Sequence, residues 1–227
     1  RMKWHRALGI DPDKLRFHDH DKLAHYAAAA VDVEFEFPFG FKEVEGIHSR
    51  TDFDLGKHQE FSKKKLQYFD PEINKNYVPY VIETSAGADR LFFMLLCNGF
   101  KQVEVGEGDK VKQRTFLKFH PALAPVKAAI LPLVKKDGLP EIGKKIFDDL
   151  KYDFNLAYED AASIGKRYTR QDLIGTPFCI AVDHQTKEDE TVTIRHRDSM
   201  EQERVKISEL KSRIDKEVSL KNIFNEL

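Results

Sequence analysis

The sequence contains few cysteines and no long apolar run. Its 227 residues include only Cys97 and Cys179, and neither belongs to a CxxC pair. This argues against a disulfide framework or a structural zinc site, and it suits a reducing, cytoplasmic compartment. The longest apolar run, Leu91 to Cys97, is too short to span a membrane, and the start resembles no signal peptide. We therefore expect no membrane partner.

An excess of charge of either sign is also missing. Lysine and arginine total 37, aspartate and glutamate total 38, and the formal net charge is −1. A nucleic-acid binder needs only a local basic face, so this balance does not exclude one. The length allows one large or two modest domains. Because the chain opens with Arg1 in mid-pattern, we interpret it as a fragment, or the ordered part, of a longer protein.

Residues in the first half alternate between apolar and polar side chains. The alternation at 31–37 and again at 41–47, across Pro38 and Gly40, predicts an antiparallel strand pair. Leu91 to Cys97 lies in a predicted buried helix that Gly99 ends. The remaining predictions are a polar loop or arm over 1–20, helices at 22–30 and 57–69, a loop at 71–76, a strand at 79–83 and a charged loop at 106–112.

The pattern changes near 119–125, where two prolines interrupt regular structure. We place a domain boundary there, giving domains 1–120 and 121–227. The following order of strands and helices predicts a mixed sheet with helices packed on it. The strands are expected at 126–131, 154–157, 178–182, 191–197 and 203–207, and the helices from Pro140 to Leu150, over 161–174 and after a Ser208 cap.

The segment 81–96 concentrates groups that suit a binding site. A strand ends in the carboxylate of Glu83, small residues including Ser85 and Gly87 follow, and Arg90 opens an apolar helix. A carboxylate, a hydroxyl, close backbone approach and a fixed cation then lie within one short turn. These are the groups that a small amine-bearing substrate and a polyphosphate require.

This segment resembles a known motif. Gly87-Ala88-Asp89-Arg90 before an apolar helix resembles motif 3 of class II aminoacyl-tRNA synthetases, and Glu83-x-Ser85 resembles the glycyl-tRNA synthetase version. Two further blocks, FKEVEGIHSRTDFDL at 41–55 and IGKRYTRQDLIGTP at 164–177, follow the same family in the expected order. The resemblance covers about 25–218.

The resemblance implies an α+β and α/β architecture. Residues 1–120 would be the C-terminal portion of the class II antiparallel-sheet catalytic domain, with motif 3 included and motifs 1 and 2 absent. Residues 121–227 would be the mixed-sheet α/β anticodon-binding domain. The implied activity is ATP-dependent formation of glycyl-adenylate and transfer of glycine to tRNA(Gly), with Mg²⁺ bound to the nucleotide. The full-length protein would be a homodimer, and this fragment would be inactive alone because the motif 2 arginine lies upstream.

The resemblance assigns three residues to glycine. Glu83 would bind the amine, Ser85 would complete the pocket with its hydroxyl, and Arg50 would bind the carboxylate. The residues themselves leave other interpretations open. Glu83 also fits a strand-end glutamate paired with a cation, and Ser85 fits a turn serine. Arg50 also fits a local ion pair with Asp52 or Asp54.

Three residues are assigned to ATP. Arg90 would bind the γ-phosphate, Glu43 would help hold the magnesium ion, and Gly87 would allow close approach of the nucleotide. A surface ion pair is the alternative for Arg90, although a cation at a helix N-terminus opposes the helix dipole. A solvated strand glutamate is the alternative for Glu43.

The second domain contains a basic cluster around Tyr168. Basic residues with an aromatic side chain suit single-stranded RNA, while a solvated helix face and a charged hairpin explain most such clusters. The candidate anticodon-binding residues are Arg167, Arg170, Asp172, Arg195 and Arg197, together with Lys166 and Asp198.

The histidines also offer metal-ligand types. The spacing of His18, His20 and His25 matches no site that we can justify. His48 stands where glycyl enzymes commonly have a small residue, and Thr84 where they often have proline. Two rival functions stay open: a synthetase-like RNA-binding or accessory protein without catalysis, and a generic ATP-binding domain for another acid substrate.

Overall fold

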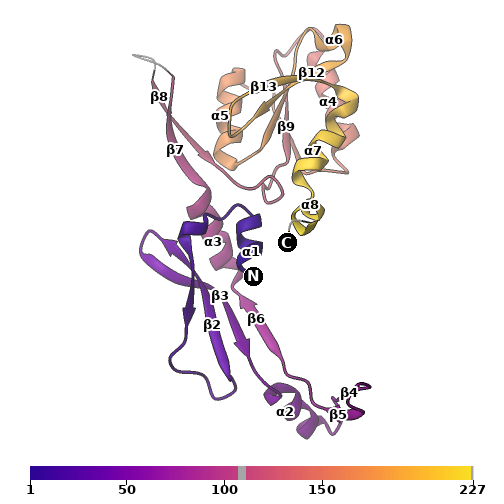
Figure 1. Ribbon diagram of the computed structural model, residues 1–227. Coiled ribbons are helices and arrows are strands. Elements are labelled where there is room, and N and C mark those ends of the chain that lie inside the picture. Colours follow the sequence, from indigo (N-terminus) through magenta and orange to yellow (C-terminus); the bar gives the residue numbers. More distant parts are fainter. Residues whose placement is uncertain (107–110, 226) are drawn as a thin grey trace. The chain divides into compact units, whose positions relative to one another are not determined.

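The computed structural model describes residues 1–106, 111–225 and 227. The chain forms two compact units (Figure 1). The N-terminal unit contains Ile10–Cys97 with Met2, and the C-terminal unit contains Asn98–Leu227 with Arg1 and Lys3–Gly9. Among the described residues, no helix has the length and apolar character needed to cross a membrane.

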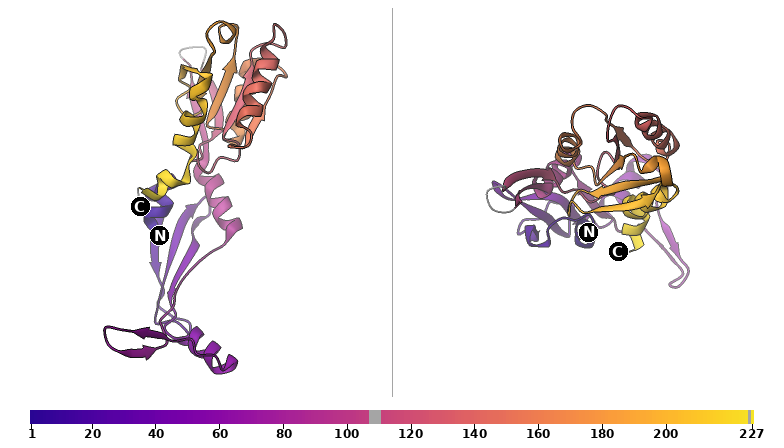
Figure 2. Two further views of the ribbon diagram at one scale, coloured as in Figure 1. Left: turned by 90° about the vertical axis from the view of Figure 1, so that its right-hand side faces the viewer. Right: turned by 90° about the horizontal axis from the view of Figure 1, so that it is seen from above.

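The N-terminal unit is built on a four-stranded antiparallel sheet of order β1-β2-β3-β6. Strands β2 (Ala29–Phe37) and β3 (Gly40–Ser49) form the long central hairpin (Figures 1 and 2), which confirms the predicted strand pair. The outer strands are β1 (Leu15–Asp19) and β6 (Ile82–Ala86). A register shift between Val33 and Glu34 marks a β-bulge in the hairpin.

The predicted helix is α3 (Ala88–Gly99), which covers the apolar face of this sheet. Met94 packs among Val33, Phe35, Phe37 and Val44, all nearly inaccessible to solvent. The prediction that α3 is buried is correct for one side only. Phe92 is 62% exposed and Phe93 is 43% exposed.

Several predictions for the N-terminal unit are wrong. Residues 22–30 form turns and the start of β2 instead of a helix, and β1 lies within the segment expected to be a loop or arm. The helix expected at 57–69 is α2 (Phe53–Ser62), which ends where Lys63 adopts a left-handed φ of 58°. The strand expected at 79–83 is β6, so Glu83 and Ser85 both lie within a strand.

Two hairpins were not predicted. Strands β4 (Tyr68–Asp70) and β5 (Lys75–Tyr77) occupy the region around the expected loop at 71–76. Strands β7 (Phe100–Val105) and β8 (Lys112–Leu117) flank the charged loop expected at 106–112, of which 107–110 lie outside the described residues. The short helices are α1 (Met2–Ala7), η1 (Pro12–Lys14), α6 (Thr186–Asp189), η3 (Ile207–Glu209) and α8 (Leu220–Asn225).

The C-terminal unit contains the predicted mixed sheet, in the order β10-β9-β11-β12-β13. The first three strands are parallel and the last two antiparallel. All ten residues of β9 and β11 are buried, as expected for parallel strands covered on both faces. The bounds are β9 (Ala128–Pro132), β10 (Leu156–Tyr158), β11 (Phe178–Val182), β12 (Thr191–His196) and β13 (Gln202–Lys206).

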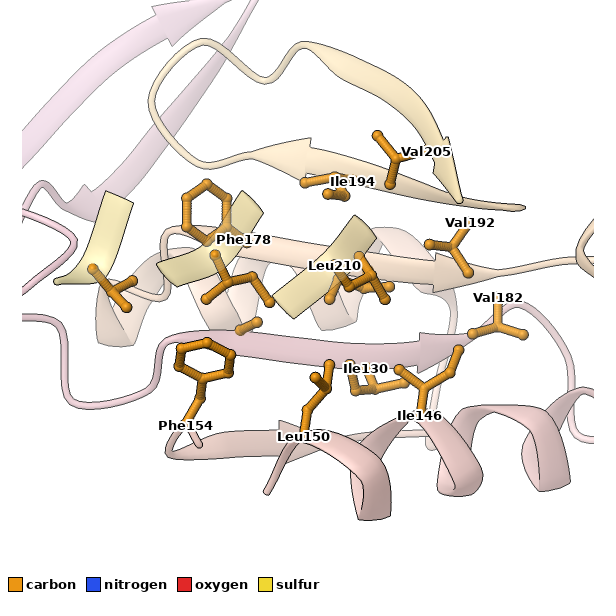
Figure 3. Close-up of a cluster of buried hydrophobic side chains, with 14 of the residues drawn as sticks. Ile130, Ile146, Leu150, Phe154, Phe178, Val182, Val192, Ile194, Val205 and Leu210 are labelled. Carbon is orange, nitrogen blue, oxygen red and sulfur yellow. The ribbon is translucent and has the colours of Figure 1, made fainter. Parts of the chain in front are cut away.

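Helices α4 (Leu139–Leu150) and α7 (Leu210–Val218) cover one face of this sheet. Figure 3 shows Ile146 and Leu150 pointing from α4 towards Ile130, in a cluster that includes Leu210. Helix α5 (Ile164–Ile174) covers the other face, with Tyr168 over a second apolar cluster. Gly175 ends α5 with φ +81°, and an added Cβ would lie 2.6 Å from the Phe119 ring. Glycine is therefore required there.

Candidate functional site

Polar side chains gather on the face of the N-terminal sheet opposite α3. Strand pairing places Glu34 opposite Glu43, Asp32 opposite Gly46, and Gly46 opposite Ser85. Since side chains alternate along a strand, these residues share one face, while Val33 and Phe35 face the core. This polar face brings together residues from β2, β3 and β6.

Glu83 and Arg50 meet at one end of the polar face. The Arg50 guanidinium donates to Glu83 Oε2 at 2.9 Å and to Asp54 through two bonds of 2.5 and 2.9 Å. It also stacks over the Tyr26 ring, 4.1 Å from its centre. The bond to Asp54 raises the pKa of Arg50, and the same bond lowers the pKa of Asp54. The structure therefore contains both alternative pairings, a local ion pair of Arg50 with Asp54 and a cationic partner for Glu83.

Ser85 lies two residues beyond Glu83 on the same strand face. Its cross-strand neighbour is Gly46, and that of Glu83 is His48. The His48 ring leans over Gly46, where an added Cβ would lie 2.9 Å from His48 Cε1. A glycine at 46 is thus what allows His48 to lie beside Glu83, and the two side chains approach to 3.6 Å between Nδ1 and Oε2.

Arg90 and Glu43, far apart in the sequence, also meet. Arg90 lies in the first turn of α3 and donates to the Glu43 backbone oxygen at 2.8 Å. Its guanidinium lies 3.3 Å from Glu43 Oε2, and both side chains remain about half exposed. The pair is accessible to a ligand, because neither charge is enclosed by protein.

A hollow of about 410 Å³ lies beside this pair. Its lining combines Arg90, Glu43 and Lys42 with the Phe39 and Phe93 rings, which are nearly parallel at 6.2 Å. Two cations, a carboxylate and aromatic faces fit the donor and acceptor needs of a nucleoside polyphosphate with its magnesium ion. The lining does not include Glu83 or Ser85 among the described residues. Gly87 precedes α3 and would accept a Cβ at ordinary contact distance.

The polar face does not form a metal centre of histidines. His20 Nε2 lies 2.8 Å from Asp32 Oδ2, and its ring is 5.8 Å from that of His18. His25 packs against Tyr26 and Phe53 instead. Among the described residues, no group of three or more histidine, cysteine, aspartate or glutamate side chains is arranged to hold a metal ion.

The C-terminal unit places most of its candidate residues in its interior. Asp172 is 3% exposed and accepts bonds of 2.9 and 3.1 Å from Arg195 and of 3.0 and 2.9 Å from Arg114. Burial alone would lower the pKa of Arg195, but the hydrogen bonds and the charge of Asp172 outweigh this effect, so the pKa of Arg195 is raised. Two arginines and one aspartate therefore form a buried ion cluster that joins α5, β8 and β12.

Arg197 and Arg167 bond chiefly to backbone oxygens. Arg197 is 2% exposed and donates to Gly175 and Phe119, each at 2.7 Å. Arg167 is 1% exposed and donates to the oxygens of Pro132, Glu159 and Leu133. Burial lowers the pKa of Arg167. These guanidinium groups stabilise loops through their terminal nitrogens, whereas the buried Nε of Arg167 has no hydrogen-bond partner among the described residues.

Arg170 and Lys166 are different, since both are exposed on α5. Arg170 keeps 47% of its side chain exposed although it bonds Glu159. A hollow of about 510 Å³ lies beside α5 and β8, lined in part by Lys112, Tyr168 and Arg195. This is the accessible polar surface near the predicted RNA-binding residues.

Sequence reasoning missed Arg114 and Arg204. Arg114 donates to Asp172, which also accepts from Arg195. Arg204 donates two hydrogen bonds to the Asp183 carboxylate, at 2.6 and 2.7 Å. The sequence does indicate that Asp172, the partner of Arg114, needs a buried cation beside it. Asp172 follows Tyr168 by one helical turn, so it lies on the inner face of α5, where a carboxylate needs a cation.

Comparison with known proteins identifies the C-terminal unit first. Residues 127–217 match the family model described as "Anticodon binding domain". The five-stranded sheet and helices α4, α5 and α6 fall within this match, which ends one residue before the end of α7.

Relatives are similar over nearly the whole chain. The glycine–tRNA ligase of Treponema denticola is 49% identical over 222 residues, which cover 96% of this chain and 49% of that protein. Those of Chlorobaculum tepidum and Borreliella burgdorferi are each 52% identical, covering 92% and 96% of this chain and 44% and 50% of theirs. The chain thus spans about half the length of these curated relatives.

The fold agrees with these relatives. A crystal structure of prolyl-tRNA synthetase from Cryptosporidium parvum, complexed with L-proline and AMP, superposes with a TM-score of 0.63 over 98% of this chain and 44% of that one. At 16% identity this similarity concerns the fold alone. An antiparallel sheet followed by a mixed α/β unit is therefore the arrangement of a class II synthetase, as predicted. By its sequence and its fold, the chain belongs to the glycine–tRNA ligase family of class II aminoacyl-tRNA synthetases.

Proposed function

We propose that this chain is the part of a glycine–tRNA ligase that carries motif 3 and the anticodon-binding domain. The full-length protein would activate glycine with ATP and transfer it to tRNA(Gly). The observation that carries the proposal is the polar face, where Arg50 donates to Glu83 and Ser85 lies two residues further along the same strand face, opposite Gly46. A carboxylate, a hydroxyl and a guanidinium on one such face suit a small amino acid.

Glycine would bind with its ammonium group on Glu83 and a hydrogen bond to Ser85. The Arg50 guanidinium donates to Glu83 Oε2 at 2.9 Å. This charge-assisted bond would fix the orientation of the Glu83 carboxylate before glycine binds. Arg50 would then turn one donor towards the glycine carboxylate while Asp54 continues to hold the others.

ATP would bind at the hollow beside Arg90, with Arg90 on the γ-phosphate, Glu43 towards the magnesium ion and Gly87 near the nucleotide. Bound ATP with its magnesium would supply the α-phosphate that the glycine carboxylate attacks, with pyrophosphate as the leaving group. The present Arg90–Glu43 pair is exposed and weak, so a polyphosphate can displace it at small cost. Arg90 then stabilises the charge that develops on the phosphates.

The C-terminal unit would bind the anticodon of tRNA(Gly). Arg170 is the predicted RNA-binding arginine with the most accessible charge, and Lys166 and Lys112 extend the basic surface. Arg195 and Asp172 would shape the hollow beside α5 rather than contact many phosphates, since they bind each other. Arg167 and Arg197 would support the same surface from inside.

The first experiment is ATP–pyrophosphate exchange with glycine. The full-length protein that contains this chain is expected to be active, and this 227-residue chain alone inactive, because the motif 2 arginine is not in it. Robust exchange by the chain alone would contradict this division of the active site.

A second experiment separates the ligase from its rival, a synthetase-like RNA-binding protein without catalysis. Glu83→Gln in the full-length protein removes the charge that would hold the glycine ammonium, and Arg90→Gln removes the phosphate donor. Each is expected to reduce exchange by about 10²-fold or more while leaving tRNA(Gly) binding intact. Wild-type protein that binds tRNA(Gly) but shows no exchange would favour the rival.

The proposal has three further parts. The domain boundary lies at 120/121, although the two compact units divide between Cys97 and Asn98. The full-length protein is a homodimer, and it acts in the cytoplasm. Exposed apolar side chains on the N-terminal unit, including Phe39, Ile82 and Phe92, support additional protein contacts there. Light scattering of the full-length protein measures the dimer, and a monomer at micromolar concentration would refute it.

A further inference from the structure

His48 is the side chain on the polar face whose role the proposed function leaves unexplained. It lies opposite Glu83 across the β3–β6 ladder, and its Nδ1 is 3.6 Å from Glu83 Oε2. That nitrogen is buried and has no hydrogen-bond partner among the residues that the structure describes. A buried polar atom without a partner is unusual in a folded protein and calls for an explanation.

The other charged groups around His48 are already paired. On the β2 side, Asp32 is bound by His20 at 2.8 Å. The His20 ring, just beyond β1, is 6.4 Å from the His48 ring. Beyond β3, Arg50 divides its donors between Glu83 and Asp54 at the start of α2. The carboxylate within closest reach of His48 is therefore Glu83.

We propose that His48 is a positioning residue for Glu83, and that glycine binds productively only while the His48 imidazole is neutral. This rests on the proposed role of Glu83 as the partner of the glycine ammonium group. Neutral His48 packs over Gly46 and limits the orientations of the Glu83 carboxylate. Protonated His48 places a second cation within 3.6 Å of that carboxylate, where it competes with the ammonium group.

The consequence is a pH-dependent affinity for glycine. Imidazole changes its charge between pH 5 and 8, whereas glycine keeps its ammonium and carboxylate throughout that interval. If the neutral form alone is competent, the apparent KM for glycine rises in inverse proportion to the fraction of enzyme in which His48 is neutral. The turnover number at saturating glycine does not follow that titration, because bound glycine holds His48 neutral.

The test uses the full-length protein, with KM for glycine and kcat measured by ATP–pyrophosphate exchange from pH 6.0 to 8.0 at saturating ATP and magnesium. In the wild type, KM is expected to rise about threefold or more towards pH 6.0. In His48→Asn and His48→Gln, which cannot titrate, KM is expected to change by less than about half that factor. Titration of the ATP phosphates affects all the proteins equally and cancels in the comparison.

His18→Asn is the matched control. His18 lies on the same face of the sheet but on β1, two strands from His48. This variant is expected to keep the wild-type pH profile. An equal change in His18→Asn and His48→Asn would show that any histidine on this face acts through general charge, and the specific role of His48 would be lost.

Calorimetry gives a readout independent of turnover. Binding of a non-hydrolysable glycyl-adenylate analogue is measured at pH 6.5 in two buffers of different ionisation enthalpy, which counts the protons released. The wild type is expected to release more protons than His48→Asn, because binding expels the proton from His48. Equal proton release, or equal pH dependence of KM, would overturn the proposal. An inactive wild type that does not bind the analogue would instead contradict the proposed function.

Discussion

The two units use the same charged residue types in opposite ways. In the N-terminal unit, Arg90 and Glu43 form an ion pair in which each side chain is about half exposed. In the C-terminal unit, Arg195 and Asp172 form one in which each side chain is less than a tenth exposed. In an accessible ion pair, a ligand can replace one of the two side chains at a small cost in free energy. Opening a buried ion pair leaves a charge buried without a partner, which is strongly destabilising. The accessible charges are therefore the candidates for chemistry, and the buried charges hold the fold.

The most severe way to test this contrast is Asp172→Ala. The substitution leaves Arg114 and Arg195 buried and without their shared carboxylate, so the free energy of unfolding is expected to fall by about 3–5 kcal/mol. Urea denaturation of the chain measures the loss. Hydrogen exchange followed by mass spectrometry is expected to place it in α5 and β12.

Asp148→Ala provides the matched control for Asp172→Ala. Asp148 is an aspartate on a helix of the same unit, but its side chain is 60% exposed and, among the described residues, forms an ion pair with Lys151 one turn away. Its loss is expected to change stability by about 0.5 kcal/mol or less. Similar losses in the two variants would show that the buried cluster contributes no more than a surface pair.

A second pair of variants compares neighbours on α5. Arg167→Met removes the donor for three backbone oxygens and is expected to cost about 2–3 kcal/mol. Arg170→Met, three residues later, removes an exposed ion pair with Glu159 and is expected to cost less than about 1 kcal/mol. Urea denaturation of both variants gives the difference. A larger cost for Arg170→Met would reverse the assignment of interior and surface roles on this helix.

A third, pH-dependent prediction concerns Asp183 and Arg204. Hydrogen bonds from Arg204 lower the pKa of Asp183 below its ordinary value of 3.8. A lowered folded-state pKa gives stability that is present above pH 3.8 and is lost as pH falls through the folded-state pKa. Arg204→Met is therefore expected to lower the free energy of unfolding by about 1.5 kcal/mol at pH 7, and by less at pH 3. A difference from wild type that is the same at both pH values would contradict this account.

The two units also differ in how far the sequence predicts them. The C-terminal elements were predicted closely, because buried parallel strands are continuous apolar runs and Gly175 ends α5. The predicted Ser208 cap is wrong, because Ser208 lies within η3 and the N-cap of α7 is Glu209, which makes no side-chain cap hydrogen bond. Edge elements of the N-terminal unit were missed. Strand β1 buries only Leu15, so it lacks the alternation that identifies a strand. The alanines before β2 favour a helix locally, but pairing of Ala29 and Ala30 with β3 prevails.

Sequence predicted the candidate site unevenly for a physical reason. Motif residues on β3 and β6 are brought together by strand pairing, so the proximity of Glu83, Ser85 and Arg50 follows from the sheet. Whether an arginine is a surface ligand or an interior donor depends on tertiary packing. The residues around Arg167 and Arg197 carry no local sign that their guanidinium groups reach backbone oxygens more than 20 residues away. The RNA-binding assignments were therefore the weakest.

The smallest expected effect is the most informative about the N-terminal unit. Arg90→Met removes a guanidinium that bonds the Glu43 backbone and carboxylate at an exposed position. Because solvent replaces such contacts, the free energy of unfolding is expected to change by about 0.5 kcal/mol or less. Urea denaturation and hydrogen exchange across α3 and β3 measure it. A loss above about 2 kcal/mol would mean that Arg90 stabilises the fold like the arginines of the C-terminal unit, and a reduced exchange activity in an Arg90 variant would then no longer identify it as a phosphate-binding residue.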